Sequence, residues 1–170
     1  MATTRGDTTS LKSTFADVLE RETATTLKVL GAFPKDQSEL RPHPRAKNAR
    51  ELVWLFAMEL KLASLALSDK LDTSKRFPPP PDSFDDVIAA FESGRRELLD
   101  QLETAPPDGF EGTVHFFTGP KQMGDIPKTD FLWFLLHDHI HHRGQFSVYL
   151  RMAGGKVPSI YGPSADEPWS

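Results

Sequence analysis

The ten-residue stretch Leu136–Gln145, near the end of the chain, holds the side chains most able to do chemistry. It reads LHDHIHHRGQ and contains four of the chain's six histidines and one aspartate. Imidazole and carboxylate groups at helical spacing are common ligands of divalent metals. The same groups also form plain hydrogen-bonded pairs in protein interiors. Which of the two applies here depends on where each side chain points.

Asp138 and His142 are predicted to face the interior of a helix bundle. They lie four residues apart, about one helical turn, so a carboxylate oxygen and an imidazole nitrogen can converge on one point. The other members of their stripe, at steps of three and four residues, are apolar: Phe131, Leu135, Phe146 and Tyr149. The pair is therefore either part of a metal site, with a third ligand from another element, or a satisfied polar pair.

The other polar residues of the stretch point away from that stripe, since successive residues turn by about 100°. His137 and His141 form a second pair four residues apart, which predicts a place at the edge of the helix or in a helix interface. His139 falls on the opposite flank, so we expect it to be exposed or packed against a neighbour. Arg143 could bind an anion or tie the helix to the tail, and its place beside a buried seam favours a structural pair with a carboxylate.

The sequence predicts four helical blocks, because apolar residues recur at three- and four-residue steps between clusters of Gly and Pro. These helices must position the residues named above. The blocks run over about Thr9–Leu30, Ala46–Ser68, Phe84–Glu103 and Lys128–Ala153. The second, with ELVWLFAMELKLASLAL, is apolar nearly all round, which predicts a most buried helix. Ser83 is expected to cap the third block, and Lys128-Thr129-Asp130 the fourth.

A longer connection separates the third block from the fourth. Its piece GTVHFF alternates weakly, so a short strand or hairpin is an alternative there, whereas TGPKQMGDIP predicts a loop. Four helices with two long connections favour an all-α fold, a four-helix bundle, over layers of helix and sheet. With 170 residues and 38% hydrophobic content, we expect one domain over 1–170.

Composition narrows the classes of function. The formal net charge of −4 includes no basic block, so neither nucleic acid nor an anionic membrane is favoured as a partner. Cysteine is absent, which excludes disulfides, thiolate zinc sites and cysteine nucleophiles. The start MATTRGDTTSLK has no apolar core of a signal peptide, and no apolar run is long enough to cross a bilayer. These features predict a cytoplasmic protein.

The end of the chain resembles a known family. HHRGQ followed by FSVYLRMAGGKVPSIYGPSADE is similar to the closing helix and tail of the DinB/YfiT-like superfamily of bacterial proteins, and the likeness extends through ELVW to most of the chain. It implies an up-down-down-up four-helix bundle, usually a homodimer, with a divalent metal held between helices by three histidines. Some relatives are thiol-dependent transferases or isomerases, and many have no known activity.

Carried over to this chain, the family's metal ligands are altered. The last histidine of the triad falls on His142, but the position one turn earlier is Asp138, and the second-helix histidine falls on Leu55. Leucine cannot bind a metal, whereas Glu59, one turn after Leu55, could offer a carboxylate. The candidate metal set is therefore Glu59, Asp138 and His142. The alternative for Glu59 is a surface acid or half of an ion pair.

Two hard oxygens and one nitrogen would change the preferred ion. Manganese, iron, nickel and zinc all remain candidate cofactors, and the oxygens shift the preference toward manganese, iron(II) or magnesium. Two classes of function stay open. One is a divalent-metal-dependent enzyme with an altered triad, of thiol-dependent transferase or hydrolase type, acting on a small molecule. The other is a metal-free binding or interaction protein that acts through its dimer surface, which Leu55 favours.

Overall fold

The computed structural model describes residues 6–170, and the side chains of all of these except 6–10 and 107. The first five residues of the predicted domain, and with them part of MATTRGDTTSLK, lie outside the described residues. The elements follow in the order α1 (Gly6–Gly31), η1 (Lys35–Gln37), α2 (Ala49–Leu67), α3 (Phe84–Thr104), η2 (Pro107–Phe110), β1 (Thr113–Gly119), β2 (Gln122–Pro127) and α4 (Lys128–Met152). All four predicted helices are present, with ends within a few residues of those expected.

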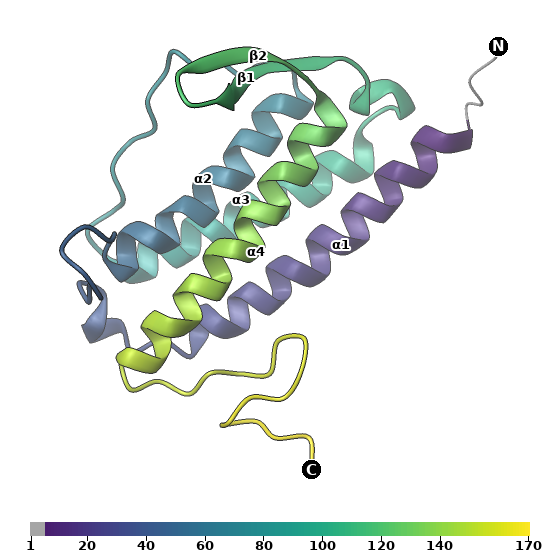
Figure 1. Ribbon diagram of the computed structural model, residues 1–170. Coiled ribbons are helices and arrows are strands. Elements are labelled where there is room, and N and C mark those ends of the chain that lie inside the picture. Colours follow the sequence, from purple (N-terminus) through teal and green to yellow (C-terminus); the bar gives the residue numbers. More distant parts are fainter. Residues whose placement is uncertain (1–5) are drawn as a thin grey trace.

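Each helix packs against two others, and the connections set their directions. α2 contacts α3 and α4, and α1 contacts the same two helices. α1 and α4 run in one direction and α2 and α3 in the other (Figure 1). Because α2 and α3 are parallel, the connection 68–83 has to return along the length of the bundle. It forms a long arch beside α2, called the strap below.

Among the described side chains, α2 and α4 are the most buried helices, as predicted, with ten buried residues in each. α2 begins with a complete capping box, in which the Asn48 side chain accepts from the Glu51 backbone and the Glu51 carboxylate accepts from the Asn48 backbone. The interior of the bundle is rich in aromatic rings, among them Phe56, Phe91 and Phe146. Among the described residues, no helix is both long and apolar enough to cross a membrane.

The predicted cap of α3 is confirmed, and that of α4 is wrong. The Ser83 hydroxyl accepts a hydrogen bond from the Asp86 backbone at 3.4 Å. At α4 the N-cap position is Pro127 and no side chain caps the helix; the Lys128 backbone N–H instead donates to Gly112 O at 3.0 Å. α4 thus starts directly after β2, and a backbone carbonyl accepts from its first N–H in place of a capping side chain.

The connection between α3 and α4 contains a two-stranded antiparallel hairpin, so the chain is not purely all-α. β1 pairs with β2 from Thr113↔Pro127 to Gly119↔Gln122, with an irregularity between Phe117 and Gly119. The stretch TGPKQMGDIP, predicted as a loop, therefore supplies the end of β1 and all of β2. Its Pro and Gly residues form a tight turn in which Lys121 has a φ of 60°. The hairpin covers one end of the bundle (Figure 1).

Candidate metal centre

Glu59 is a buried carboxylate that lies between two histidines of α4. Only 6% of its surface is exposed, so it is not the surface acid of the alternative interpretation. Its Oε1 lies 2.6 Å from Nδ1 of His142, and its Oε2 lies 3.2 Å from Nδ1 of His139. A carboxylate accepts hydrogen bonds, so each Nδ1 carries the hydrogen and donates it. One acidic group from α2 thus orients two imidazole rings of α4.

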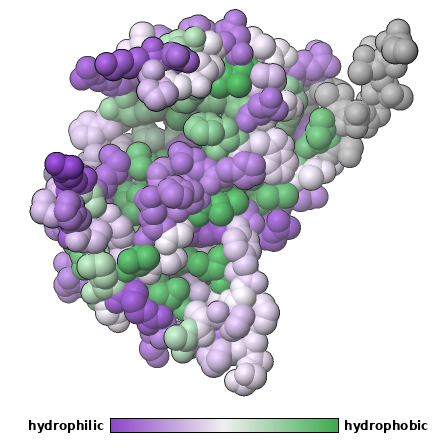
Figure 2. All heavy atoms as spheres, viewed as in Figure 1, coloured by the Kyte–Doolittle hydropathy of each residue, from purple (hydrophilic) through white to green (hydrophobic). Residues whose placement is uncertain are grey.

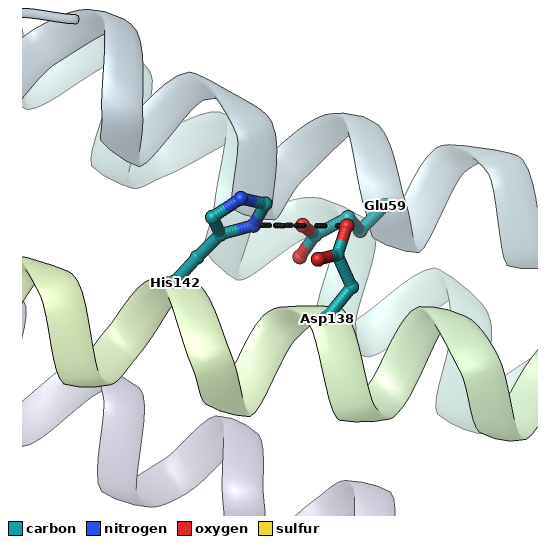
Figure 3. Close-up of side chains that lie close together, drawn as sticks. All are labelled: Glu59, Asp138 and His142. Atoms are coloured by element: carbon teal, nitrogen blue, oxygen red, sulfur yellow. Dashed lines mark hydrogen bonds and ion pairs between the residues drawn. The ribbon is translucent and has the colours of Figure 1, made fainter. Parts of the chain in front are cut away.

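Asp138 completes a group of three ligand atoms. It is half-buried, and its Oδ2 lies 3.9 Å from Nδ1 of His142, one turn further along α4. Glu59, Asp138 and His142 each offer one donor atom, and these atoms all lie within 4.8 Å of one another. Figure 3 shows the two carboxylates and the ring converging from α2 and α4. The three residues proposed from the sequence are therefore brought together.

The charges of this group affect the protonation of His142. The hydrogen bond to Glu59 is the main cause that raises the pKa of His142 above its ordinary value, and burial opposes it. The negative charges of Glu59 and Asp138 raise this pKa further. A proton on His142 and a metal ion would occupy the same place between the ring and the carboxylates, so they compete.

His139 corrects the prediction made for it. It was expected on the flank, exposed or packed against a neighbour, but it is only 2% exposed and points into the bundle. Besides its contact with Glu59, its Nε2 lies 2.8 Å from the Thr26 hydroxyl of α1. Its ring stacks on Phe91 of α3 at 5.6 Å between centroids and 13° between planes. His139 therefore contacts all three other helices and fixes the second oxygen of Glu59.

The reason is a rotation of α4 relative to the predicted seam. Its buried residues include Leu132, His139, Arg143 and Leu150, which form a second stripe beside the expected one. The centre of the buried face therefore lies between these two stripes. Asp138 is displaced to the margin of this face and is half-buried. His137 and His141 are exposed, in keeping with the predicted edge position. His139 and Arg143 are also four residues apart, and this spacing could have indicated from the sequence that they share the buried face of α4.

Arg143 has the structural role that the sequence favoured. Its Nη2 donates to Glu22 Oε2 at 2.7 Å and to the Tyr161 hydroxyl at 2.8 Å, and the Tyr161 hydroxyl donates to the same Glu22 oxygen at 2.6 Å. Burial alone would raise the pKa of Glu22, but the hydrogen bonds from Tyr161 and Arg143 outweigh it and lower that pKa. Arg143 thus ties α4 to α1 and to the tail.

A hollow of about 320 Å³ lies beside His142 on the outer side of the group. Its walls come from α2, α4 and the residues before α2, and they include Leu55, Lys47, Gln145 and Tyr149. Leu55, at the family's histidine position, is half-buried on this wall. The Tyr149 hydroxyl donates to Lys47 O at 2.9 Å, as expected for a core tyrosine with a satisfied hydroxyl. A small molecule in this hollow would contact His142 directly.

The donor set fits a divalent ion. Ligand atoms that share one ion at roughly 2.0–2.2 Å lie about 3.0–3.5 Å apart. Nδ1 of His142 is 2.6 Å from Glu59 and 3.9 Å from Asp138, on either side of that spacing, and the three ligand atoms all lie within 4.8 Å of one another, so side-chain rotations would have to bring them to equal distances from an ion. His139 supplies the outer-shell hydrogen bond that ligating carboxylates commonly have.

Known proteins resemble this chain in sequence and in fold. A model of the DinB family matches residues 7–169. The chain belongs to the DinB family. A DinB-like protein from Bacillus cereus ATCC 10987 has a similar structure, with a TM-score of 0.71 and 21% identity over 86% of this chain and 95% of that one. The DinB-like protein YjoA of Bacillus subtilis has a TM-score of 0.67 and 15% identity over 84% and 93%.

A further protein matches a shorter segment of this chain. The uncharacterized protein YrdA of Bacillus subtilis strain 168 is 48% identical over 42 residues, which is 25% of this chain and 25% of that protein. The match thus spans a quarter of the relative's length. The two solved structures are below 25% identical, so their likeness concerns the DinB fold alone.

Proposed function

We propose that this DinB-family protein is a divalent-metal-dependent enzyme whose metal is held by Glu59, Asp138 and His142. The observation that carries the proposal is the buried carboxylate of Glu59, which is aimed at a second carboxylate and an imidazole at the edge of an open hollow. Buried carboxylates are rare unless they are paired or bind a metal. Two oxygens and one nitrogen suit manganese or iron(II) better than zinc or nickel.

The residues around the three candidate ligands have different roles in this proposal. His139 bonds to the second oxygen of Glu59, so the carboxylate would keep one orientation if its first oxygen and His142 bound an ion. A divalent ion supplies Lewis acidity, which lowers the pKa of a water or thiol that shares it. Because the chain has no cysteine, a thiol has to come from a cosubstrate. Lys47 and Gln145 border the hollow and can orient a small polar or anionic substrate.

Metal binding tests the proposal directly. Metal-free protein is titrated with Mn²⁺, Zn²⁺ and Ni²⁺ by calorimetry, and bound metal is measured by elemental analysis. His142→Ala and Asp138→Asn should each weaken binding by at least tenfold. His141→Ala is the matched control, because His141 is the adjacent residue but is exposed, bonds to Gln145, and is not one of the three candidate ligands. Equal loss in the control would contradict the assignment.

A metal-free binding protein is the second candidate. The hydrogen bond of 2.6 Å between Glu59 and His142 satisfies both groups without a metal, and Leu55 removes one family ligand. α4 also exposes apolar side chains, with Phe134 49% exposed and Val148 57% exposed, which favour a partner surface. This candidate would have a homodimer of a single cytoplasmic domain and no metal. Sedimentation of metal-free protein as a dimer, together with no metal uptake, would favour it over the enzyme.

A further inference from the structure

We propose that a cavity beneath the strap binds an amphipathic organic anion, with an apolar body inside and an anionic group at the rim. The cavity lies between α2, α3, the strap and β1, and its lining shares no residue with that of the hollow at His142. It shares no residue with the candidate metal centre, so this site goes beyond the proposed function.

The cavity has the size and lining of a small-molecule site. Its volume is about 800 Å³, within the range of ligand pockets. Small residues, Ala57, Ala90 and Gly94, form the floor where α2 and α3 meet, and apolar side chains such as Leu62, Phe77 and Phe116 form the walls. Figure 2 shows the opening at the upper left, below the hairpin. An apolar body of acyl-chain or aromatic size would replace water against these surfaces.

The strap is anchored near both of its ends, and the cavity lies beneath the part between these anchors. Near its end, the Trp54 Nε1–H donates to Pro78 O at 2.9 Å and Arg50 donates to Pro81 O at 2.8 Å. At its start, Lys128 forms an ion pair with Asp69 at 2.9 Å. The run of four prolines between residues 78 and 81 is stiff and cannot collapse into the cavity. Preformed sites bind with less loss of entropy.

The rim of the cavity carries an excess of positive charge, although the chain has a net charge of −4. Four basic and two acidic side chains line it: Lys61, Lys70, Lys75, Arg76, Asp72 and Glu97. Asp72 is paired with Lys75 at 3.6 Å, and Glu97 accepts from Ser93 at 3.0 Å. In the part of the chain whose side chains are described, Lys61, Lys70 and Arg76 have no carboxylate partner. Three free cations at the mouth of an apolar cavity match a carboxylate, sulfonate or phosphate group.

The same charges disfavour a second copy of the chain as the occupant. A two-fold contact brings a patch against itself, so Lys61, Lys70 and Arg76 would face their own copies. Like charges across a contact cost free energy, whereas an anion at the rim gains it. A small amphipathic anion therefore fits the charge and the depth of this site better than a dimer contact.

Displacement of a fluorescent anion tests the site. The full-length protein is titrated with 8-anilinonaphthalene-1-sulfonate, which is then displaced with dodecanoate or with dodecyltrimethylammonium, a cation of the same chain length. We expect one binding site and displacement by dodecanoate at concentrations at least tenfold lower than for the cation. His142→Ala should bind the probe as wild type does, because the metal centre is separate.

Paired variants locate the binding. Ala90→Phe, which fills the floor, should weaken dodecanoate binding at least tenfold, whereas Ala89→Phe, at the preceding exposed residue, should not. Lys70→Glu combined with Arg76→Glu should also weaken it at least tenfold, and Lys28→Glu on α1 should not. Circular dichroism verifies that each variant folds.

Three results would overturn the proposal. The first is equal displacement by the cationic and the anionic amphiphile, and the second is an equal effect of the cavity variants and their controls. The third is failure of dodecanoate to bind while Ala90→Phe converts a dimer to a monomer in sedimentation, which would make this face an interface between copies.

Discussion

Replacing His139 by alanine should destabilise the protein strongly, and more than the same change at His142. His139 contacts α1, α2 and α3 at once, whereas His142 contacts Glu59 and Asp138 and has a side chain that is 16% exposed. The imidazole of His139 therefore connects α4 to the three other helices in the interior, although it is not one of the three candidate ligands.

The magnitude follows from the contacts that are lost. A hydrogen bond to a charged group such as the Glu59 carboxylate contributes about 1.5–3 kcal/mol, and one to a neutral hydroxyl such as Thr26 about 0.5–1.5 kcal/mol. The ring stack on Phe91 contributes about 0.5–1.5 kcal/mol, and the remaining cavity adds to the loss. Thr26 keeps its hydrogen bond to Glu22 O, which limits the total. We expect His139→Ala to cost about 3–5 kcal/mol, against about 1–3 kcal/mol for His142→Ala.

Urea unfolding of metal-free protein, followed by circular dichroism, measures both values. For a chain of this size the loss at His139 should lower the midpoint of thermal unfolding by about 6–20 °C. Thr26→Val is the control, since it removes the hydroxyl that bonds to the same ring and to Glu22 O, and it should cost about 1–2 kcal/mol. A cost for His139→Ala no larger than that for His142→Ala would refute the placement of this ring in the interior.

Three further outcomes are expected. Arg143→Ala should cost about 3–5 kcal/mol in urea unfolding because Glu22 is left buried with an unpaired charge. His142 has a raised pKa, so the stability that its charge contributes in metal-free protein is complete below pH 6.5 and is lost as the pH rises through the folded-state pKa; the difference in thermal midpoint between wild type and His142→Gln should shrink over that range. Leu55→His, on the wall of the same hollow, should strengthen Ni²⁺ and Zn²⁺ binding at least tenfold in calorimetry.

The helices could be predicted from the sequence because their signals are local. Apolar periodicity and the capping residue Ser83 lie within the segments that they organise. The hairpin was partly missed because Gly and Pro in TGPKQMGDIP signal a break equally well in a loop and in a tight turn between strands. Only the pairing of β1 with β2, seen in the register Val114↔Ile126, distinguishes the two.

In the candidate site, too, features set by local spacing could be predicted and features set by distant contacts could not. Glu59, Asp138 and His142 were found from spacing and resemblance, since i and i+4 positions share a helix face. The burial of His139 was not, because its partners Thr26 and Glu59 lie 113 and 80 residues away in sequence. α4 packs against both α1 and α2, so its buried face is wider than the stripe that one seam requires. The rotation of a helix between two partners is set by tertiary packing.

The ion pair between Glu22 and Arg143 constrains the order in which contacts can form during synthesis of the chain. Its partners are 121 residues apart, and Tyr161, which bonds to both, follows 18 residues later. During synthesis the N-terminal part emerges first, so α1 exists with Glu22 unpaired until α4 and then the tail have been made. A chain that ends before Tyr161 would keep the ion pair but open it to water on the tail side. C-terminal truncation should therefore increase hydrogen exchange in the middle of α1, far from the cut in sequence.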